Sequence, residues 1–391
     1  MKKNALRPRA LTGIAAVLTA AIALTACGSE TKSAGTPSNA ANTVKDPIVT
    51  TYDGGLYVLD GESLKVAKDI PLDGFIRINP AGNDRHMLVS TGTGFRVLDA
   101  LSPELTSIEY KGSKPGHVVR HAGRTVLFAD GTGEVTILDS KTVGEAKAAT
   151  RTYKSAAPHH GVAIELENGE LVTTLGTEEK RVGILVLDKD HKEIARNESC
   201  PGVHGETTAK GEVVVIGCQD GVLIYKGGAI TKVKSPTAYG RIGNQSGSDT
   251  SPIVLGDYKK DADAELERPE QVSLINTETG TLKLVDLGTS YTFRSLGRGP
   301  QDQALVLGTD GQIHVIDPEA AKVTKTIPVI KKWTEPLEWQ EARPALFVRG
   351  GTAYVSDPTT KNLYAIDIAA GKVVTTVPLP KAPNELSGIR H

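Results

Sequence analysis

The sequence predicts an all-β protein, specifically an eight-bladed β-propeller with four-stranded blades. A short pattern occurs eight times: a turn residue, four or five apolar or β-branched residues, and usually an aspartate. The copies lie at 55–60, 94–99, 134–139, 183–188, 221–225, 272–276, 312–317 and 362–367. They recur every 40 to 50 residues or so, which is the length of one propeller blade.

Each blade is expected to contain an inner strand at a central channel, two middle strands, and an outer strand, with the repeated pattern as the third strand. The fourth blade is expected to comprise 160–166, 171–175, 183–188 and 192–197, and the fifth 204–209, 213–218, 222–226 and 229–234. An Asn-Gly pair separates the first two strands of the fourth blade, which is a strong hairpin signal.

The two ends of the propeller domain are expected to join. The first repeat begins at its second strand, 48–52, whereas residues 386–391 follow a completed blade. We therefore expect the C-terminal segment to supply the inner strand of the first blade, which closes the ring and hides two sheet edges. Seven blades with one hairpin extension are the alternative. The acidic and basic segment 259–269 is expected to be an exposed loop.

The N-terminal segment has the pattern of an export signal. Basic residues precede an apolar stretch, 11–23, that is too short to cross a bilayer. Leu-Thr-Ala-Cys, ending at Cys27, resembles the lipobox of bacterial lipoproteins. We expect residues 1–26 to be a lipoprotein signal peptide, Cys27 to be lipidated, residues 27–46 to be a flexible tether and residues 47–391 to form the propeller. An ordinary signal peptide is the alternative.

The export signal predicts where the protein acts, and its composition excludes some kinds of partner. The protein is expected to be exported and lipid-anchored at the outer face of the cytoplasmic membrane, in the periplasm if the organism has two membranes. A net charge of −1 argues against nucleic acid and against membrane contact other than through the anchor. A monomer is expected. Only two tryptophans are present, which argues against WD40 and quinoprotein propellers.

The two cysteines of the propeller, Cys200 and Cys218, are expected to form a disulfide in an oxidising compartment. A zinc site that uses both thiolates is the alternative. The pair flanks His204, so the bridge would hold the start of an inner strand.

Histidines mark the beginnings of three consecutive inner strands. His117, His159, His160 and His204 occur in the contexts Pro-Gly-His, Pro-His-His-Gly and Pro-Gly-Val-His-Gly. Equivalent positions of adjacent blades lie at one channel mouth, so these imidazoles are expected to converge. Three neutral imidazoles with an open fourth position suit Zn²⁺. The alternative is that they are scattered polar loop residues satisfied by the backbone.

Other polar residues are weaker candidates. His121 and Glu206 are expected to be additional ligands or partners of the ligands. His86, His191 and His314 are expected at the surface, and the role of His391 stays open.

The motifs of residues 158–220 resemble those of the exported AztD-type zinc metallochaperones. The resemblance rests on Pro-His-His-Gly, Cys-Pro-Gly-Val-His-Gly-Glu and Gly-Cys-Gln-Asp-Gly. It implies a β-propeller that binds zinc through His117, His159 or His160, and His204, and that delivers zinc to the solute-binding protein of a zinc ABC transporter. The lipobox and the lack of a histidine-rich N-terminal tail depart from that family.

The sequence thus favours a non-enzymatic metallochaperone that captures and delivers zinc. A metal-dependent propeller hydrolase of the lactonase type is one alternative, although clustered imidazoles differ from the carboxylates and asparagines around calcium in such enzymes. A non-catalytic scaffold for another envelope protein is the second alternative.

Overall fold

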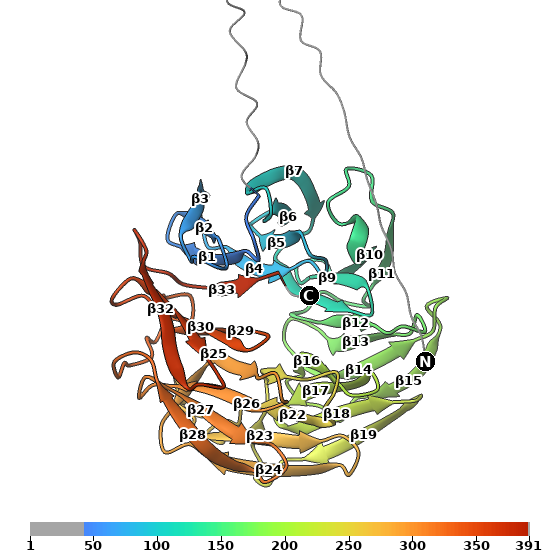
Figure 1. The fold of residues 1–391 in the computed structure, drawn as a ribbon. Helices are drawn as coiled ribbons and strands as arrows, with labels where there is room; N and C mark the ends of the chain where they lie inside the picture. The colour runs from blue at the N-terminus through green and yellow to red at the C-terminus, as the bar shows by residue number, and fades with distance from the viewer. Residues whose placement is uncertain (1–42, 390–391) are drawn as a thin grey trace, which may run out of the picture. The chain divides into compact units, whose positions relative to one another are not determined.

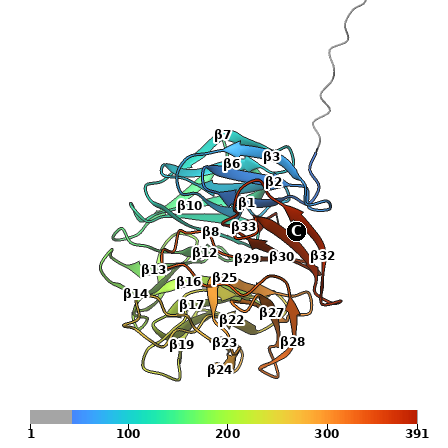
Figure 2. The same cartoon turned by 90° about the vertical axis from the view of Figure 1, so that its left-hand side faces the viewer.

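Eight small antiparallel sheets form a ring around a central channel (Figure 1, Figure 2). The computed structural model describes residues 43–389. The predicted signal peptide, Cys27, most of the predicted tether and His391 lie outside these residues. Within 43–389, no helix is long and apolar enough to cross a membrane.

The strands of seven blades run from the channel outward in chain order, and blade 1 takes its inner strand from the end of the chain. Blade 1 contains β33 (Leu386–Gly388), β1 (Ile48–Tyr52), β2 (Gly55–Leu59) and β3 (Val66–Pro71). Blade 2 contains β4 (Arg77–Pro80), β5 (His86–Ser90), β6 (Gly94–Asp99) and β7 (Glu104–Lys111). Blade 3 contains β8 (Pro115–His121), β9 (Arg124–Ala129), β10 (Glu134–Asp139) and β11 (Thr150–Lys154), with the short helix η1 (Ser140–Thr142) after β10. Blade 4 contains β12 (Ala163–Glu165), β13 (Leu171–Gly176), β14 (Arg181–Leu187) and β15 (Glu193–Asn197).

The second half of the ring repeats this plan. Blade 5 contains β16 (His204–Ala209), β17 (Val213–Cys218), β18 (Asp220–Lys226) and β19 (Ala229–Lys234), and β20 (Gly240–Arg241) pairs with β18. Blade 6 contains β21 (Gln245–Ser246), β22 (Ile253–Gly256), β23 (Gln271–Asn276) and β24 (Thr281–Asp286). Blade 7 contains β25 (Tyr291–Arg298), β26 (Ala304–Gly308), β27 (Gln312–Asp317) and β28 (Lys322–Pro328). Blade 8 contains β29 (Ala345–Arg349), β30 (Thr352–Asp357), β31 (Asn362–Asp367) and β32 (Lys372–Pro378).

The ring closes as the sequence predicts, with eight blades. β33 pairs antiparallel with β1, and Leu386 lies opposite Thr50. Glu385 strengthens the seam, because its carboxylate accepts hydrogen bonds from Arg77 Nε at 2.9 Å and from the Ile78 amide at 3.1 Å. The pairing removes the two sheet edges that would otherwise be open.

The apolar core is divided among the interfaces between blades. Eight clusters of buried side chains occur in the described residues, one between each pair of neighbouring blades. Middle strands such as β1 and β17 are buried along their whole length, whereas the outer strand β32 alternates between intermediate and exposed residues. Burial on both faces explains why the repeated pattern is a continuous apolar run.

Strand direction defines two mouths of the channel. All inner strands run the same way, so the connections that enter them, and the turns between second and third strands, share one mouth, which we call the entry mouth. The turns that follow the inner strands form the opposite exit mouth. A cavity of about 640 Å³ between them is lined by all eight inner strands or their flanking residues.

Several local expectations need correction. β12 begins at Ala163, so His159 and His160 lie in the connection before the inner strand and not within it. His314 was expected at the surface but is only 4% exposed, because it belongs to a middle strand and its Nε2 lies 3.1 Å from Asp310 Oδ2. His86 and His191 are half-buried.

The exposed loop is confirmed, whereas the end of the predicted tether contacts the propeller. The segment 259–269 is mostly exposed, as expected. At the end of the predicted tether, Val44 is buried and its amide donates to Leu101 O at 2.8 Å. Residues from Val44 onward therefore contact the propeller.

Candidate metal centre

Irregular backbone at the entry mouth positions the histidines. The pairing of β8 with β9 shifts register between Pro115 and Val118, and His117 lies in this bulge. Gly116 is required beside it, because an added Cβ would lie 2.1 Å from Asp130 Oδ1. A second bulge follows His204 at the start of β16, where Gly205 has a φ of +74°. Bulges of this kind redirect side chains at a strand end.

His117, His160 and His204 come together at the entry mouth from three consecutive blades. Their ring centroids are 5.0 to 5.5 Å apart. One potential ligand atom of each lies within 4.8 Å of the others, and this is the one such group found among residues 43–389.

Two of the three imidazoles are fixed through their Nδ1 atoms. His204 Nδ1 donates a hydrogen bond to Gly243 O at 2.7 Å. His160 Nδ1 lies 2.5 Å from Asp130 Oδ2, a charge-assisted contact. A proton held on Nδ1 leaves the lone pair of Nε2 free to bind a metal ion.

The surroundings keep the imidazoles of His117 and His204 neutral. Burial lowers the pKa of His117 well below its ordinary value, and His204 and His160 lower it further. Burial, followed by Arg241 and His160, lowers the pKa of His204 to about 3. Neutral imidazole is the form that binds a metal, so these shifts favour metal binding near neutral pH.

Glu206 lies next to this group. Its Oε2 is 3.8 Å from His117 Nδ1, beyond hydrogen-bonding distance. Burial raises the pKa of Glu206 to about 8. The carboxyl group is therefore neutral at pH 7 without a metal and close enough to respond to one.

The structure does not bring His159 or His121 to the three histidines. His159 is 1% exposed, and both its ring nitrogens are engaged, by Ala157 O at 2.9 Å and by Thr174 Oγ1 at 3.0 Å. His121 lies at the exit mouth, where its Nε2 is 2.7 Å from Glu212 Oε1. Of the adjacent pair 159 and 160, only His160 is available as a ligand.

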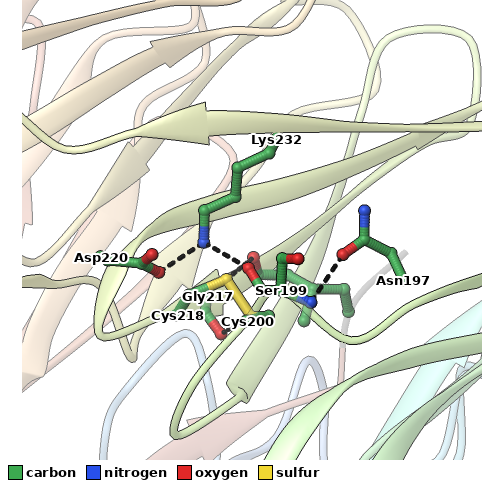
Figure 3. The surroundings of a disulfide bond; sticks show 8 residues. Asn197, Ser199, Cys200, Gly217, Cys218, Asp220 and Lys232 are labelled. Carbon is green, nitrogen blue, oxygen red and sulfur yellow. Dashed lines mark hydrogen bonds and ion pairs between the residues drawn. A yellow bond between two sulfur atoms is a disulfide. The ribbon is translucent and has the colours of Figure 1, made fainter.

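A disulfide joins Cys200 and Cys218, as the sequence predicts, and both cysteines are buried (Figure 3). Lys232 adds a second clamp, because its Nζ donates to Ser199 O at 2.9 Å and to the Asp220 carboxylate. The loop that enters β16 and carries His204 is thus tied to β17 and to β19.

Sequence reasoning missed the residues that hold the imidazoles. Asp130 follows the second strand of blade 3, and Gly243 lies between blades 5 and 6. The turn at Asp130 opens on the entry mouth, which is a signal that could have identified it. Gly243 acts through its backbone carbonyl, for which its residue type gives no signal.

Together these residues form a preorganised nitrogen site. Three imidazoles, two of them oriented by outer hydrogen bonds, match the ligand set of Zn²⁺ with one coordination position left for an exchangeable ligand.

The chain is similar to the zinc chaperone AztD of Citrobacter koseri. The two sequences are 23% identical over 296 residues, which cover 73% of this chain and 68% of AztD. A structure of apo AztD superimposes with a TM-score of 0.75 at 21% identity, over 88% of this chain and 96% of that one. This similarity confirms the resemblance that the sequence motifs indicated. A scan against protein-family models found no match.

A more distant structure shares the fold. The dihydro-heme d1 dehydrogenase NirN aligns with a TM-score of 0.61 at 12% identity, over 87% of this chain and 74% of that one. At this identity the likeness concerns the eight-bladed architecture and not the chemistry at the channel mouth.

Proposed function

We propose that this protein is an extracytoplasmic zinc metallochaperone. It captures Zn²⁺ with His117, His160 and His204 and delivers it to the solute-binding protein of a zinc ABC transporter, without catalytic turnover. The observation that carries the proposal is the convergence of three imidazoles, in a protein that is similar to a zinc chaperone.

The ligand set favours zinc over hard cations. Ca²⁺ and Mg²⁺ prefer oxygen ligands, whereas imidazole nitrogen suits Zn²⁺. A three-histidine site leaves one position for water or an incoming ligand. A partner can therefore attack the metal before any histidine leaves.

The position of the site favours exchange within a complex. The three histidines lie at the entry mouth, where His160 is exposed. Passive release from a tight site is slow, because affinity is mostly reflected in the dissociation rate. Direct transfer to a docked receptor avoids that limit.

The disulfide and the N-terminal sequence support the proposed location. The Cys200–Cys218 bridge is consistent with an extracytoplasmic compartment. We further propose that Cys27 carries lipid and that the tether holds a monomeric propeller near the outer face of the cytoplasmic membrane, within reach of the transporter.

Elemental analysis and a transfer assay test this function. The purified protein is expected to bind about one zinc ion per chain, and a His117→Ala, His160→Ala, His204→Ala variant is expected to bind none at this site. Zinc-loaded protein should transfer metal to the apo solute-binding protein faster than a strong chelator extracts it. Unchanged affinity in the triple variant would refute the site, and transfer at the rate of chelator extraction would refute the delivery role.

A further inference from the structure

Two arginines without partners flank the three histidines. Arg181 is the first residue of β14 and Arg241 is the last residue of β20. Neither side chain makes a hydrogen bond or an ion pair with any residue in 43–389, and Arg181 Nη1 is buried without a partner. Buried donors are normally satisfied, so Arg181 Nη1 is expected to bind a ligand atom or an ordered water.

One backbone contact and one side-chain contact place the two arginines beside the residues that carry or hold His204. Arg181 O accepts a hydrogen bond from the Gly202 amide at 2.9 Å, within the loop that carries His204. Arg241 packs on Gly243, whose carbonyl holds His204, because a Cβ on Gly243 would lie 2.5 Å from Arg241 Nη1. Both guanidinium groups act electrostatically on His204, and Arg241 also acts on Arg181.

The charges do not suit a bare cation site. A bound Zn²⁺ would add two positive charges beside two guanidinium groups. Asp130 is a nearby fixed anion, and both its oxygens are engaged, Oδ2 by His160 and Oδ1 by the Gly161 amide at 3.3 Å. Glu206 also lies beside His117, but burial raises its pKa to about 8, so it carries no charge at pH 7 unless it loses its proton. An anion that enters with the metal would balance the charge and satisfy the free donors.

We propose that Arg181 and Arg241 bind a carboxylate that serves as the fourth ligand of the metal ion held by His117, His160 and His204. The guanidinium fork matches the geometry of a carboxylate, and a carboxylate oxygen is a normal zinc ligand. The inference rests on the proposed function, since it needs a metal on the three histidines. The carboxylate is either a small free anion or an acidic side chain of the receiving protein.

Cobalt(II) substitution tests the proposal, because the visible spectrum of tetrahedral Co²⁺ changes when its fourth ligand changes. The full-length protein loaded with Co²⁺ is titrated with acetate at constant ionic strength, and Co²⁺ affinity is measured with and without acetate. Wild-type protein should show a spectral change and a gain in affinity of about fivefold or more. An Arg181→Gln, Arg241→Gln variant should bind Co²⁺ but lose both responses.

Matched variants keep the outcome decisive. Arg120→Gln removes another arginine that has no hydrogen bond within 43–389 but lies next to His121, at the exit-mouth end of β8, and it should respond to acetate like wild type. A wild-type protein that binds Co²⁺ without responding to acetate would overturn the inference and leave the proposed function intact. A response that appears only in Glu206→Gln would also overturn it, by assigning the fourth position to Glu206. Failure of the histidines to bind Co²⁺ would overturn the proposed function itself.

The transfer assay distinguishes the two sources of the carboxylate, a small free anion and an acidic side chain of the receiving protein. Excess acetate should slow metal transfer to the apo solute-binding protein if an acidic side chain of that protein takes the fourth position. Transfer that is unaffected by acetate, together with the spectral response, assigns the position to a small free carboxylate.

Discussion

The two ends of β8 carry histidines in opposite situations. At the entry mouth, His117 faces two other imidazoles at ring-centroid distances of 5.1 and 5.5 Å. At the exit mouth, four residues later, His121 lies against the carboxylate of Glu212, which also accepts the Glu167 amide at 2.9 Å. One engaged nitrogen does not exclude a ligand, since His160 and His204 each have one as well; what distinguishes the entry mouth is that three imidazoles converge there. Position along a strand does not decide this alone.

Removal of an imidazole should give the largest difference in zinc affinity between the two ends. His204→Ala should lower zinc affinity by well over about 100-fold, because the loss of an outer-shell partner alone typically costs 10- to 100-fold. His121→Ala should change it less than about twofold, within the effect of a distant substitution. Competition with a chromophoric chelator measures both. Equal losses in the two variants would erase the distinction between the mouths.

Removal of a carboxylate at each end should give the second-largest difference in zinc affinity. Asp130→Ala removes the acceptor that orients His160 and should lower zinc affinity by about 10- to 100-fold. Glu212→Ala removes the equivalent partner of His121 and should leave zinc affinity unchanged. If both variants bound zinc like wild type, the hydrogen bond of His160 would have no role in orienting a ligand.

The fold and part of the site could be predicted for the same reason. Repetition gives eight equivalent inner strands, so histidines at equivalent positions of blades 3, 4 and 5 were expected to share a mouth. The choice between His159 and His160 could not be predicted, because both precede β12 and strand alternation does not apply there. Asp130 and Gly243 lie 30 and 39 residues from the histidines they hold, and such distant pairs leave no local pattern.

The pH dependence of zinc binding should be a smaller effect that is also specific to the entry mouth. Burial raises the pKa of Glu206 to about 8, so a zinc ion that interacts with this carboxyl group at pH 7 releases its proton. Wild-type affinity should therefore rise by up to about tenfold between pH 7 and 9 and then level off, since metal binding is linked to proton release. Glu206→Gln should show a flatter profile. Identical profiles would mean that zinc does not interact with this carboxyl group.

The raised pKa of Glu206 can also be tested in the metal-free protein. A carboxyl group whose pKa is raised on folding contributes stability that is fully present below its ordinary value of 4.5 and is lost as pH rises through about 8. The melting temperature of metal-free wild type should therefore fall between pH 5 and 8 relative to Glu206→Gln. A constant difference between the two proteins would contradict the raised pKa.

The smallest expected effect concerns the clamp on the loop before β16. The Cys200–Cys218 bridge closes 18 residues of chain, and a loop of this size contributes about 3 kcal/mol in the chain-entropy description. Because both cysteines are buried between blades 4 and 5, reductants reach them slowly, and a Cys200→Ser, Cys218→Ser variant is the better test.

Most of the lost stability should be local, since eight blade interfaces and the Lys232 contacts remain. The His204 loop should exchange its amide hydrogens faster, and zinc affinity should fall about two- to fivefold, because a less ordered ligand loses part of its binding energy to ordering. The surroundings of His121 should keep their exchange rates, because Glu212 lies just before the start of β17 and Cys218 lies at its other end. Equal loosening at both mouths, or tighter zinc binding without the bridge, would show that the disulfide serves the whole ring and not the metal centre.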